Sequence, residues 1–143
     1  MLKTAYTYTI AARLAAVGPV CLALRELAQE AGLSPEIQMA VELAVCEAIN
    51  NAIVHALKDH RSAAVEIEIV IEAGRLEVFV REHGREIPAG VIANIDESNL
   101  DPGLDCDVAS LATSGRGLHM IDALCSEWNY HSAKGVNTFS LYF

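Results

Sequence analysis

The sequence contains no low-complexity tract, no internal repeat and no linker rich in proline, glycine or serine. Of its 143 residues, 52% are hydrophobic and 20% are charged, a balance that excludes an intrinsically disordered chain. A chain of this length can bury a proper core within one domain. We therefore predict a single folded domain over residues 1–143.

Long apolar runs are missing as well. No run approaches the roughly 20 residues that a membrane-spanning helix needs. The N-terminal MLKTAYTYTI lacks the apolar stretch and the cleavage site of a signal peptide. We expect a cytoplasmic protein that does not enter a membrane.

The four cysteines form no C-x-x-C pair and have no histidine at zinc-ligand spacing, which excludes the common zinc-binding motifs. Cys21, Cys46 and Cys125 lie among apolar residues of predicted helices, where a free cysteine behaves as a small buried hydrophobe. We expect these three and Cys106 to be reduced thiols.

Positive charge is scarce. The formal net charge is −9, which argues against a nucleic-acid backbone as a partner. From Glu86 to Asp107 there are six carboxylates and no lysine or arginine. This segment is either solubilising surface or a cover that meets a basic protein partner.

Periodicity predicts the order strand, two helices, two strands, loop, helix, two strands. This order favours an α/β (α+β) two-layer sandwich, in which helices cover one face of a mixed, largely antiparallel sheet. The predicted elements are a strand over 3–10, a helix from Gly18 to Gly32, a helix from Ser34 to about Lys58, hairpins over 63–84 and 128–143, and a helix after 114. A loop of about 84–114, with a short helix near 89–95, has the length of a functional lid.

The stretch CEAINNAIVHA, residues 46–56, places polar side chains in an otherwise apolar helix. Glu47 and Asn51 are four residues apart and therefore share one face. The apolar positions Val41, Ala44, Val45, Ala48 and Ala52 form the stripe that should pack on the sheet. The polar pair either meets water, or holds a hydrated magnesium ion and a proton to be moved.

Two further segments could contribute to a site. SGRGLHM, residues 114–120, places glycines before an apolar helix, and the backbone N–H groups of such a helix start bind anions, phosphate above all. VREHG, residues 80–84, ends a strand with a carboxylate at Glu82 and a glycine at Gly84. The carboxylate could accept a hydrogen bond from an adenine amino group while the glycine leaves room for the base. Each segment also fits an ordinary turn.

Together, ELAVCEAINNAIVHA, VREHG and GRGLHMIDAL, in this order, resemble the ATP-binding domain of the GHKL superfamily. More narrowly, the chain resembles the stand-alone anti-sigma-factor serine kinases of bacterial partner-switching systems, from its first strand through GVNTFSLYF. The helical element from Glu47 to Asn51 is the most specific of these motifs.

The resemblance implies a role for each matching residue. Asn51 would ligate Mg²⁺ and Glu47 would be the base that orients or deprotonates the attacking hydroxyl. Glu82 and Gly84 would lie at the adenine and Thr138 would support that end of the nucleotide. Backbone amides of Gly115, Arg116, Gly117 and Leu118 would bind the phosphates.

The sequence departs from the family pattern at three positions. The carboxylate that reads adenine is normally aspartate and here is Glu82. Glu86 stands where the family has a second glycine, and Ser126 stands where it has an aspartate near the end of the last long helix.

The resemblance implies a serine/threonine protein kinase that phosphorylates an anti-anti-sigma (STAS-type) protein and, in its other state, holds a sigma factor. The 33 residues before Ser34 leave no room for the dimerisation helices of a sensor histidine kinase. The alternative is a binding module of the same fold with little catalysis, which Glu82, Glu86 and Ser126 favour. A homodimer is compatible with the apolar first helix and strand.

Overall fold

The computed structural model describes residues 2–58, 63–93 and 116–143. Five strands form one sheet in the order β1-β2-β3-β5-β4, and all four pairings are antiparallel. The strands are β1 Lys3–Ala11, β2 Ala64–Glu72, β3 Arg75–Glu82, β4 Glu127–Ala133 and β5 Val136–Tyr142. The predicted strands and both predicted hairpins are confirmed.

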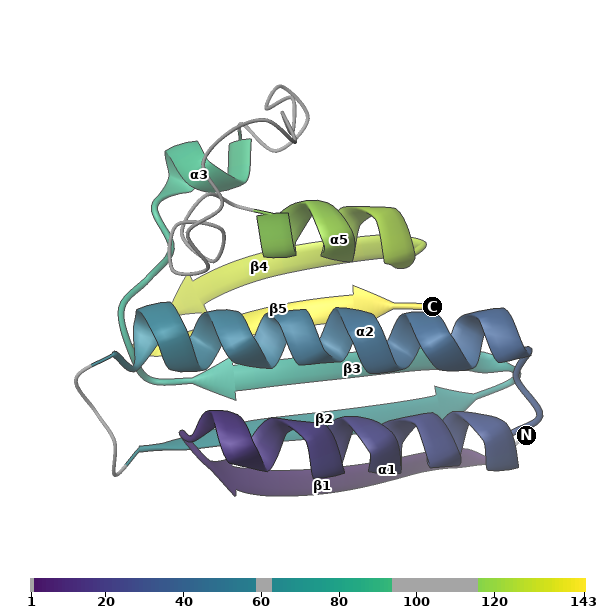
Figure 1. Cartoon of the computed structure of the whole chain (residues 1–143). Helices are drawn as coiled ribbons and strands as arrows, with labels where there is room; N and C mark the ends of the chain where they lie inside the picture. The colour runs from purple at the N-terminus through teal and green to yellow at the C-terminus, as the bar shows by residue number, and fades with distance from the viewer. Residues whose placement is uncertain (1, 59–62, 94–115) are drawn as a thin grey trace, which may run out of the picture.

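The long helices lie on one face of this sheet and make the second layer of the sandwich (Figure 1). Helix α2 runs along the middle of the sheet, with α1 on one side of it and α5 on the other. The helices are α1 Val17–Glu30, α2 Pro35–Asn51, α3 Ala89–Ala93 and α5 Arg116–Leu124, with a 3-10 turn η1 Leu14–Ala16 and a π-helical turn η2 Ala52–Ala56. The predicted two-layer α/β architecture is confirmed.

The core lies between the sheet and α2. Alternate residues of β2 and β3 point toward the helices, and Ile67, Ile69 and Val78 are fully buried there. The predicted stripe of α2 faces them, because Val41, Ala44, Val45 and Ala48 are fully buried and Ala52 is nearly so. Small residues dominate this stripe, so the helix backbone can lie close to the strands.

The ends of the helices are fixed by local chemistry that the sequence predicts. The Ser34 hydroxyl accepts a hydrogen bond from the N–H of Ile37 at 3.3 Å and caps α2. At the end of α1, Gly32 has a φ of +79°, and Leu33 N–H donates to the Ala28 carbonyl at 3.1 Å. This pairing is the Schellman arrangement, which places glycine in the left-handed region.

Residues Pro35–Ala56 form a helix of 22 residues that is long and apolar enough, by length and composition, to cross a membrane. In this fold its most apolar stripe packs on the sheet. A core helix of a globular domain has the same length and composition, and the burial of Val45 and Ile49 identifies α2 as one.

The predicted lid over 84–114 lies mostly outside the described residues, since 94–115 are not described. Its first part is described and contains α3, which confirms the short helix predicted near 89–95 as far as Ala93.

The end of α1 generates a stability prediction. Gly32→Ala places a Cβ in the left-handed region, so it should lower the free energy of unfolding by about 1 kcal/mol. Gly18→Ala, inside α1 and with no heavy atom within 4 Å of the added carbon, should raise it by about 0.5 kcal/mol. Urea unfolding of both variants measures the difference, and equal stabilities would contradict the cap assignment.

Candidate active site

Side chains from α2 meet the start of α5 at one point above the sheet. Glu47 and Asn51, one helical turn apart, point toward Gly117 of α5. A Cβ added at Gly117 would lie 2.9 Å from Glu47 Oε2 and 3.2 Å from Asn51 Nδ2. The sequence motifs predict that these three residues share one site, although Asn51 and Gly117 are 66 positions apart in the chain. The fold brings them into contact. We call Glu47, Asn51 and Gly117 the helix cluster.

The carboxamide of Asn51 is incompletely bonded. Its Nδ2 is buried and has no hydrogen-bond partner within the part of the chain that the structure describes. Leaving a buried N–H donor unpaired costs about 1–3 kcal/mol, so native proteins rarely tolerate one without a reason. A half-turn of the carboxamide exchanges Nδ2 and Oδ1, so this group can offer a donor to an anion or an acceptor to a cation.

The first turn of α5 supplies backbone donors beside this carboxamide. Arg116 begins the helix, and Gly117 and Leu118 follow it within the first turn. The first four N–H groups of a helix have no intrahelical acceptor and carry the positive end of the helix dipole. The Leu118 side chain is buried in the core, so only its backbone can face a ligand. Gly115 lies outside the described residues.

Glu47 lies in an environment that suits a base. It is half-buried, and this burial raises the pKa of its carboxyl group above the ordinary value. A carboxylate whose proton affinity is raised accepts a proton more readily near neutral pH. The half-buried position distinguishes Glu47 from a fully solvated surface carboxylate.

A second cluster lies at the end of β3. Glu82 is 5% exposed, and its Oε1 accepts hydrogen bonds from Gly84 N–H at 2.8 Å and from Asn137 Nδ2 at 2.6 Å. Asn137 Nδ2 also contacts the carbonyl oxygens of Gly84 at 3.0 Å and Arg85 at 3.3 Å. The Ser132 hydroxyl donates to Asn137 Oδ1 at 2.7 Å. We call Glu82, Asn137 and Ser132 the strand cluster.

Burial dominates the electrostatics of Glu82. Desolvation raises the pKa of its carboxyl group, although the hydrogen bonds from Gly84 and Asn137 and the nearby His83 act in the opposite direction. Every hydrogen bond that the described residues make to this carboxylate ends on Oε1.

Gly84 is required by a close approach of two backbones. A Cβ added there would lie 2.0 Å from the Ala56 carbonyl oxygen, and Arg85 N–H donates to that same oxygen at 2.9 Å. Ala56 ends the π-helical turn, in which Leu57 N–H donates to the Ala52 carbonyl. π-Helical turns inside α-helices are frequent at functional sites. The absence of a side chain at Gly84 therefore makes room for the carbonyl of Ala56 in η2.

Thr138, which the sequence placed at the adenine end, is not part of either cluster. In the sheet register Thr138 lies opposite Arg81, whose guanidinium pairs with Glu66 at 3.1 Å on the face away from the helices. Side chains alternate between the two faces of a strand, so the buried neighbours Asn137 and Phe139 take the helix side. Asn137, and not Thr138, is therefore the residue of β5 that lies in the strand cluster.

Asn137 and Tyr130 are the residues that sequence reasoning missed. The Tyr130 hydroxyl accepts a hydrogen bond from Ile87 N–H at 2.8 Å and so fixes the start of the segment that follows β3. Burial raises the pKa of Tyr130, and Glu82 and Glu86 contribute to this rise. Asn137 could have been found, because it is a polar residue at an inward position of a strand whose next inward residue is Phe139.

The three departures from the family pattern have different structural outcomes. Glu82 is buried in the strand cluster, whereas Glu86 is exposed. The Ser126 hydroxyl donates to the Tyr142 carbonyl at 2.9 Å, so it closes the turn after α5. A carboxylate is present four residues earlier, where Asp122 accepts a hydrogen bond from Trp128 Nε1 at 2.8 Å.

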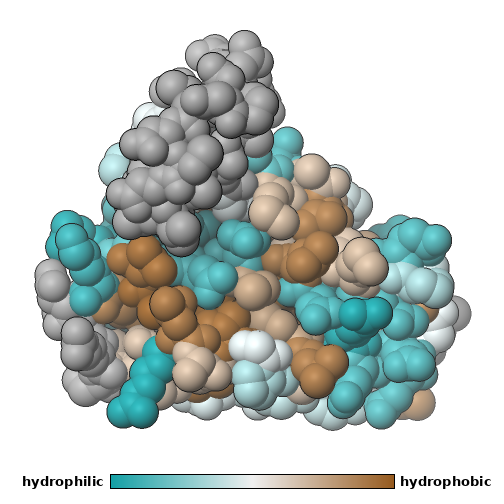
Figure 2. Space-filling model, viewed as in Figure 1, coloured by the Kyte–Doolittle hydropathy of each residue, from teal (hydrophilic) through white to brown (hydrophobic). Residues whose placement is uncertain are grey.

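The larger surface hollow lies elsewhere. Figure 2 shows hydrophobic residues gathered where α1 begins and η2 ends. A cavity of about 480 Å³ opens there, and its lining residues are Ala12, Arg13, Leu14, Ile53, Leu57 and Lys58. This lining contains neither a carboxylate nor a carboxamide, so it lacks the groups for phosphoryl chemistry, and we place the site at the two clusters instead.

The two clusters suit the two ends of a nucleotide bound with a divalent cation. Ala56, which Gly84 contacts, is five residues beyond Asn51, about 7 Å along the helix axis. The unpartnered carboxamide and the space that a Cβ at Gly117 would fill are both features that a phosphate group with a magnesium ion would satisfy.

Comparison with protein families agrees with this geometry. The model of the family described as "Histidine kinase-like ATPase domain" matches residues 10–143. The match includes both clusters and begins at Ile10, in the last two residues of β1.

Curated relatives are named as serine-protein kinases and as an anti-sigma factor. The chain is 28% identical over 116 residues to "Serine-protein kinase RsbW" of Listeria monocytogenes, covering 81% of this chain and 72% of that protein. It is 28% identical over 123 residues to the protein of the same name in Bacillus subtilis, covering 84% and 73%. It is also 29% identical over 110 residues to "Anti-sigma F factor" of Anoxybacillus flavithermus, covering 76% and 70%.

Two solved structures share the fold. The RsbU and RsbW domains of a Mycobacterium tuberculosis protein match with a TM-score of 0.64 at 21% identity, covering 97% of this chain. The chain spans only 32% of that longer protein. The SiaB–SiaC complex from Pseudomonas aeruginosa matches with a TM-score of 0.66 at 15% identity, covering 96% of this chain and 88% of that one.

The contact between Gly84 and η2 generates the second prediction. Gly84→Ala should lower the free energy of unfolding by about 3 kcal/mol or more, because a backbone carbonyl must move to admit the Cβ. Gly90→Ala is the matched control, since nothing lies within 4 Å of its added carbon in α3. Thermal and urea unfolding compare the two, and a Gly84→Ala protein as stable as the control would contradict the close approach.

Proposed function

Because the chain belongs to the histidine kinase-like ATPase domain family, we propose that it binds ATP with Mg²⁺ and transfers the terminal phosphoryl group to a serine or threonine hydroxyl of a partner protein. The names of its curated relatives, serine-protein kinase RsbW and anti-sigma F factor, support this proposal. The protein substrate would be an anti-anti-sigma protein of the STAS type. In its other state the kinase would hold a sigma factor or a similar regulator, in the cytoplasm and without contact to nucleic acid.

The observation that carries the proposal is the contact of Glu47 and Asn51 with the start of α5. Phosphoryl transfer needs little covalent help from the protein, and its main requirements are positioning and neutralisation of charge. The helix cluster combines a carboxylate of raised pKa, a carboxamide with a free buried atom and a row of helix-start amides. These are the three kinds of group that the reaction uses.

Each residue of the helix cluster has a distinct task in this proposal. Asn51 would hold the magnesium ion, which, when bound, neutralises phosphate charge. Glu47 would accept the proton of the attacking hydroxyl, and its half-buried position raises the proton affinity that this task needs. The backbone N–H groups of Arg116, Gly117 and Leu118 would donate to the phosphate oxygens.

The strand cluster would hold the adenine end. Glu82 Oε2 would accept a hydrogen bond from the adenine amino group, while Asn137 keeps Oε1 fixed. Glutamate is one methylene longer than the aspartate of the family pattern. The hydrogen bond from Asn137 of β5 would hold the longer side chain in one position. Gly84, which lies against Ala56 of η2, would be next to the adenine base.

A second candidate is a binding module with little or no turnover. The observation in its favour is that Glu82 is 5% exposed and already bonded to Gly84 and Asn137. A carboxylate that already accepts two hydrogen bonds can make fewer contacts with adenine than a carboxylate without partners. Such a module would sequester its regulator without nucleotide, so nucleotide titration separates the two candidates.

The first test of the kinase is calorimetric titration with ATP, ADP and GTP, each with and without Mg²⁺. We expect adenine nucleotides to bind in preference to GTP and to bind more tightly with magnesium. Asn51→Ala should weaken Mg-ATP binding by at least about tenfold, ~1.4 kcal/mol. The matched control is Asn50→Ala, because the Asn50 side chain donates to Cys46 Sγ at 3.6 Å and so faces α1.

Either of two outcomes would contradict this assignment. The first is the absence of adenine nucleotide binding up to about 1 mM, ~−4 kcal/mol, which would favour the binding module. The second is equal weakening by Asn50→Ala and Asn51→Ala, which would show a general effect on α2 instead of a lost contact.

The phosphoryl-transfer step has its own test. Glu47→Gln preserves the size of the side chain but removes the base, so transfer from radiolabelled ATP to a candidate STAS-type protein should slow by about 100-fold or more. ATP affinity should stay within a few-fold of the wild-type value. Glu42→Gln is the control on the same helix, since Glu42 pairs with Arg25 of α1 and is remote from α5. A rate of phosphoryl transfer in Glu47→Gln equal to that of the wild type would contradict the role of Glu47 as the base.

A further inference from the structure

Two cysteines face each other across the interface between α1 and α2. The helices are antiparallel neighbours (Figure 1), and their register is marked by an ion pair between Arg25 and Glu42 at 2.6 Å. One helical turn back along α1 from Arg25 is Cys21, and one turn forward along α2 from Glu42 is Cys46. Antiparallel helices keep such positions opposite, so the register set by the ion pair places Cys21 against Cys46 across the interface.

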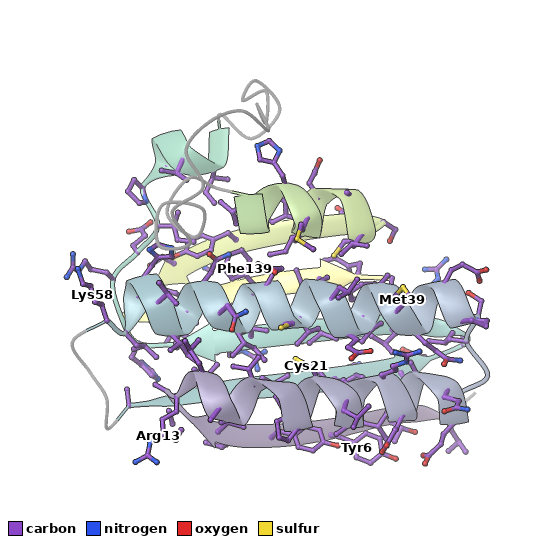
Figure 3. All side chains as sticks on the ribbon, viewed as in Figure 1. Tyr6, Arg13, Cys21, Met39, Lys58 and Phe139 are labelled. Atoms are coloured by element: carbon purple, nitrogen blue, oxygen red, sulfur yellow. The ribbon has the colours of Figure 1, made fainter. Side chains whose placement is uncertain are left out.

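The two thiols differ in exposure. Cys21 is 2% exposed, and Figure 3 shows it between the ribbons of α1 and α2. Cys46 is half-buried, so a small reagent can reach it. The sequence had placed both among small buried hydrophobes, and this description fits Cys21 only.

The chemistry of the pair is equally asymmetric. The hydrogen bond from the Cys21 thiol lowers the pKa of Cys46 to about 7, and the Asn50 side chain adds a smaller effect in the same direction. The same hydrogen bond, together with burial, raises the pKa of Cys21. Cys46 is therefore the more acidic thiol of the two, whereas Cys21 holds its proton more tightly. The thiolate is the form that reacts with oxidants.

We propose that Cys21 and Cys46 form a dithiol that hydrogen peroxide oxidises to an intramolecular disulfide between α1 and α2. The Cys46 thiolate attacks one peroxide oxygen, the O–O bond breaks, and the products are Cys46 sulfenic acid and hydroxide. Hydroxide takes the Cys21 proton to give water. The Cys21 sulfur then attacks the Cys46 sulfur, the S–O bond breaks, and hydroxide leaves. Two electrons pass from the two sulfurs to peroxide.

This modification site is separate from the proposed nucleotide chemistry, because it needs only the two thiols and the oxidant. It lies close to that chemistry, since Cys46 immediately precedes Glu47 in α2. The disulfide would tie the flank of α2 that faces α1, while Glu47 and Asn51 face α5 on the other flank.

Peptide mapping of the whole, reduced protein after peroxide treatment tests the proposal. Trypsin cleaves after Arg13, Arg25 and Lys58, so Cys21 and Cys46 fall in the peptides 14–25 and 26–58. We expect these peptides to be joined without reductant, at a mass two hydrogens below their sum, and separated by dithiothreitol. The link should form in Cys125→Ala, the control thiol. Cys21→Ala should instead accumulate a Cys46 sulfenic acid that dimedone traps.

Reactivity provides a second readout that does not depend on the link. Burial raises the pKa of Cys125 to about 12, so iodoacetamide at neutral pH should alkylate Cys46 at least about tenfold faster than Cys125. The proposal is overturned if Cys46 is alkylated no faster than Cys125. It is also overturned if peroxide drives Cys46 to sulfinic acid without a link, or links it to Cys106 or Cys125 instead of Cys21.

Discussion

The close packing of α2 on the sheet is the constraint from which the candidate site follows. Alanines 44, 48 and 52 turn the smallest possible side chains toward the strands, and all are buried. With this stripe fixed, the 3.6-residue repeat assigns the two flanks of the helix. One flank meets α1 through Glu42 and Cys46, and the other meets α5 through Glu47 and Asn51. A rotation of α2 about its axis would separate Glu47 and Asn51 from Gly117. The packing of the core therefore determines the geometry of the site.

The strand cluster shows how a longer carboxylate is accommodated without loss of order. Glu82 could extend into several rotamers, which would cost entropy on binding a base. The bond from Asn137 Nδ2 at 2.6 Å removes that freedom in advance, and the Ser132 hydroxyl fixes Asn137 in turn. Asn137 also contacts the Gly84 carbonyl, so the carboxylate and the turn after β3 are held by a single side chain. Preorganisation of this kind lowers the cost of binding a ligand.

The sequence predicts the elements well, because their signals are local. The alternation in 63–84, the Ser34 cap and the Gly32 terminus each depend on a few neighbouring residues, and each is confirmed. The partners across strands are harder, since register decides which of two adjacent residues faces the site. Thr138 and Asn137 are adjacent and polar, and only the pairing of β5 with β3 distinguishes them. The position of Cys21 opposite Cys46 depends likewise on how two helices align, which no local pattern specifies.

An acidic chain can hold a triphosphate only if local dipoles outweigh its net charge of −9. Charges farther than a Debye length of about 8–10 Å from the site are screened at physiological salt, so they act weakly on a bound anion. Glu47 and Glu82 belong to the candidate site itself. Burial raises the pKa of both carboxyl groups, which shows that negative charge is unfavourable at these two positions. The start of α5 and the Asn51 carboxamide offset this cost with fixed partial charges. If the proposed function holds, this arrangement would favour a nucleotide that arrives with its own cation over a free anion.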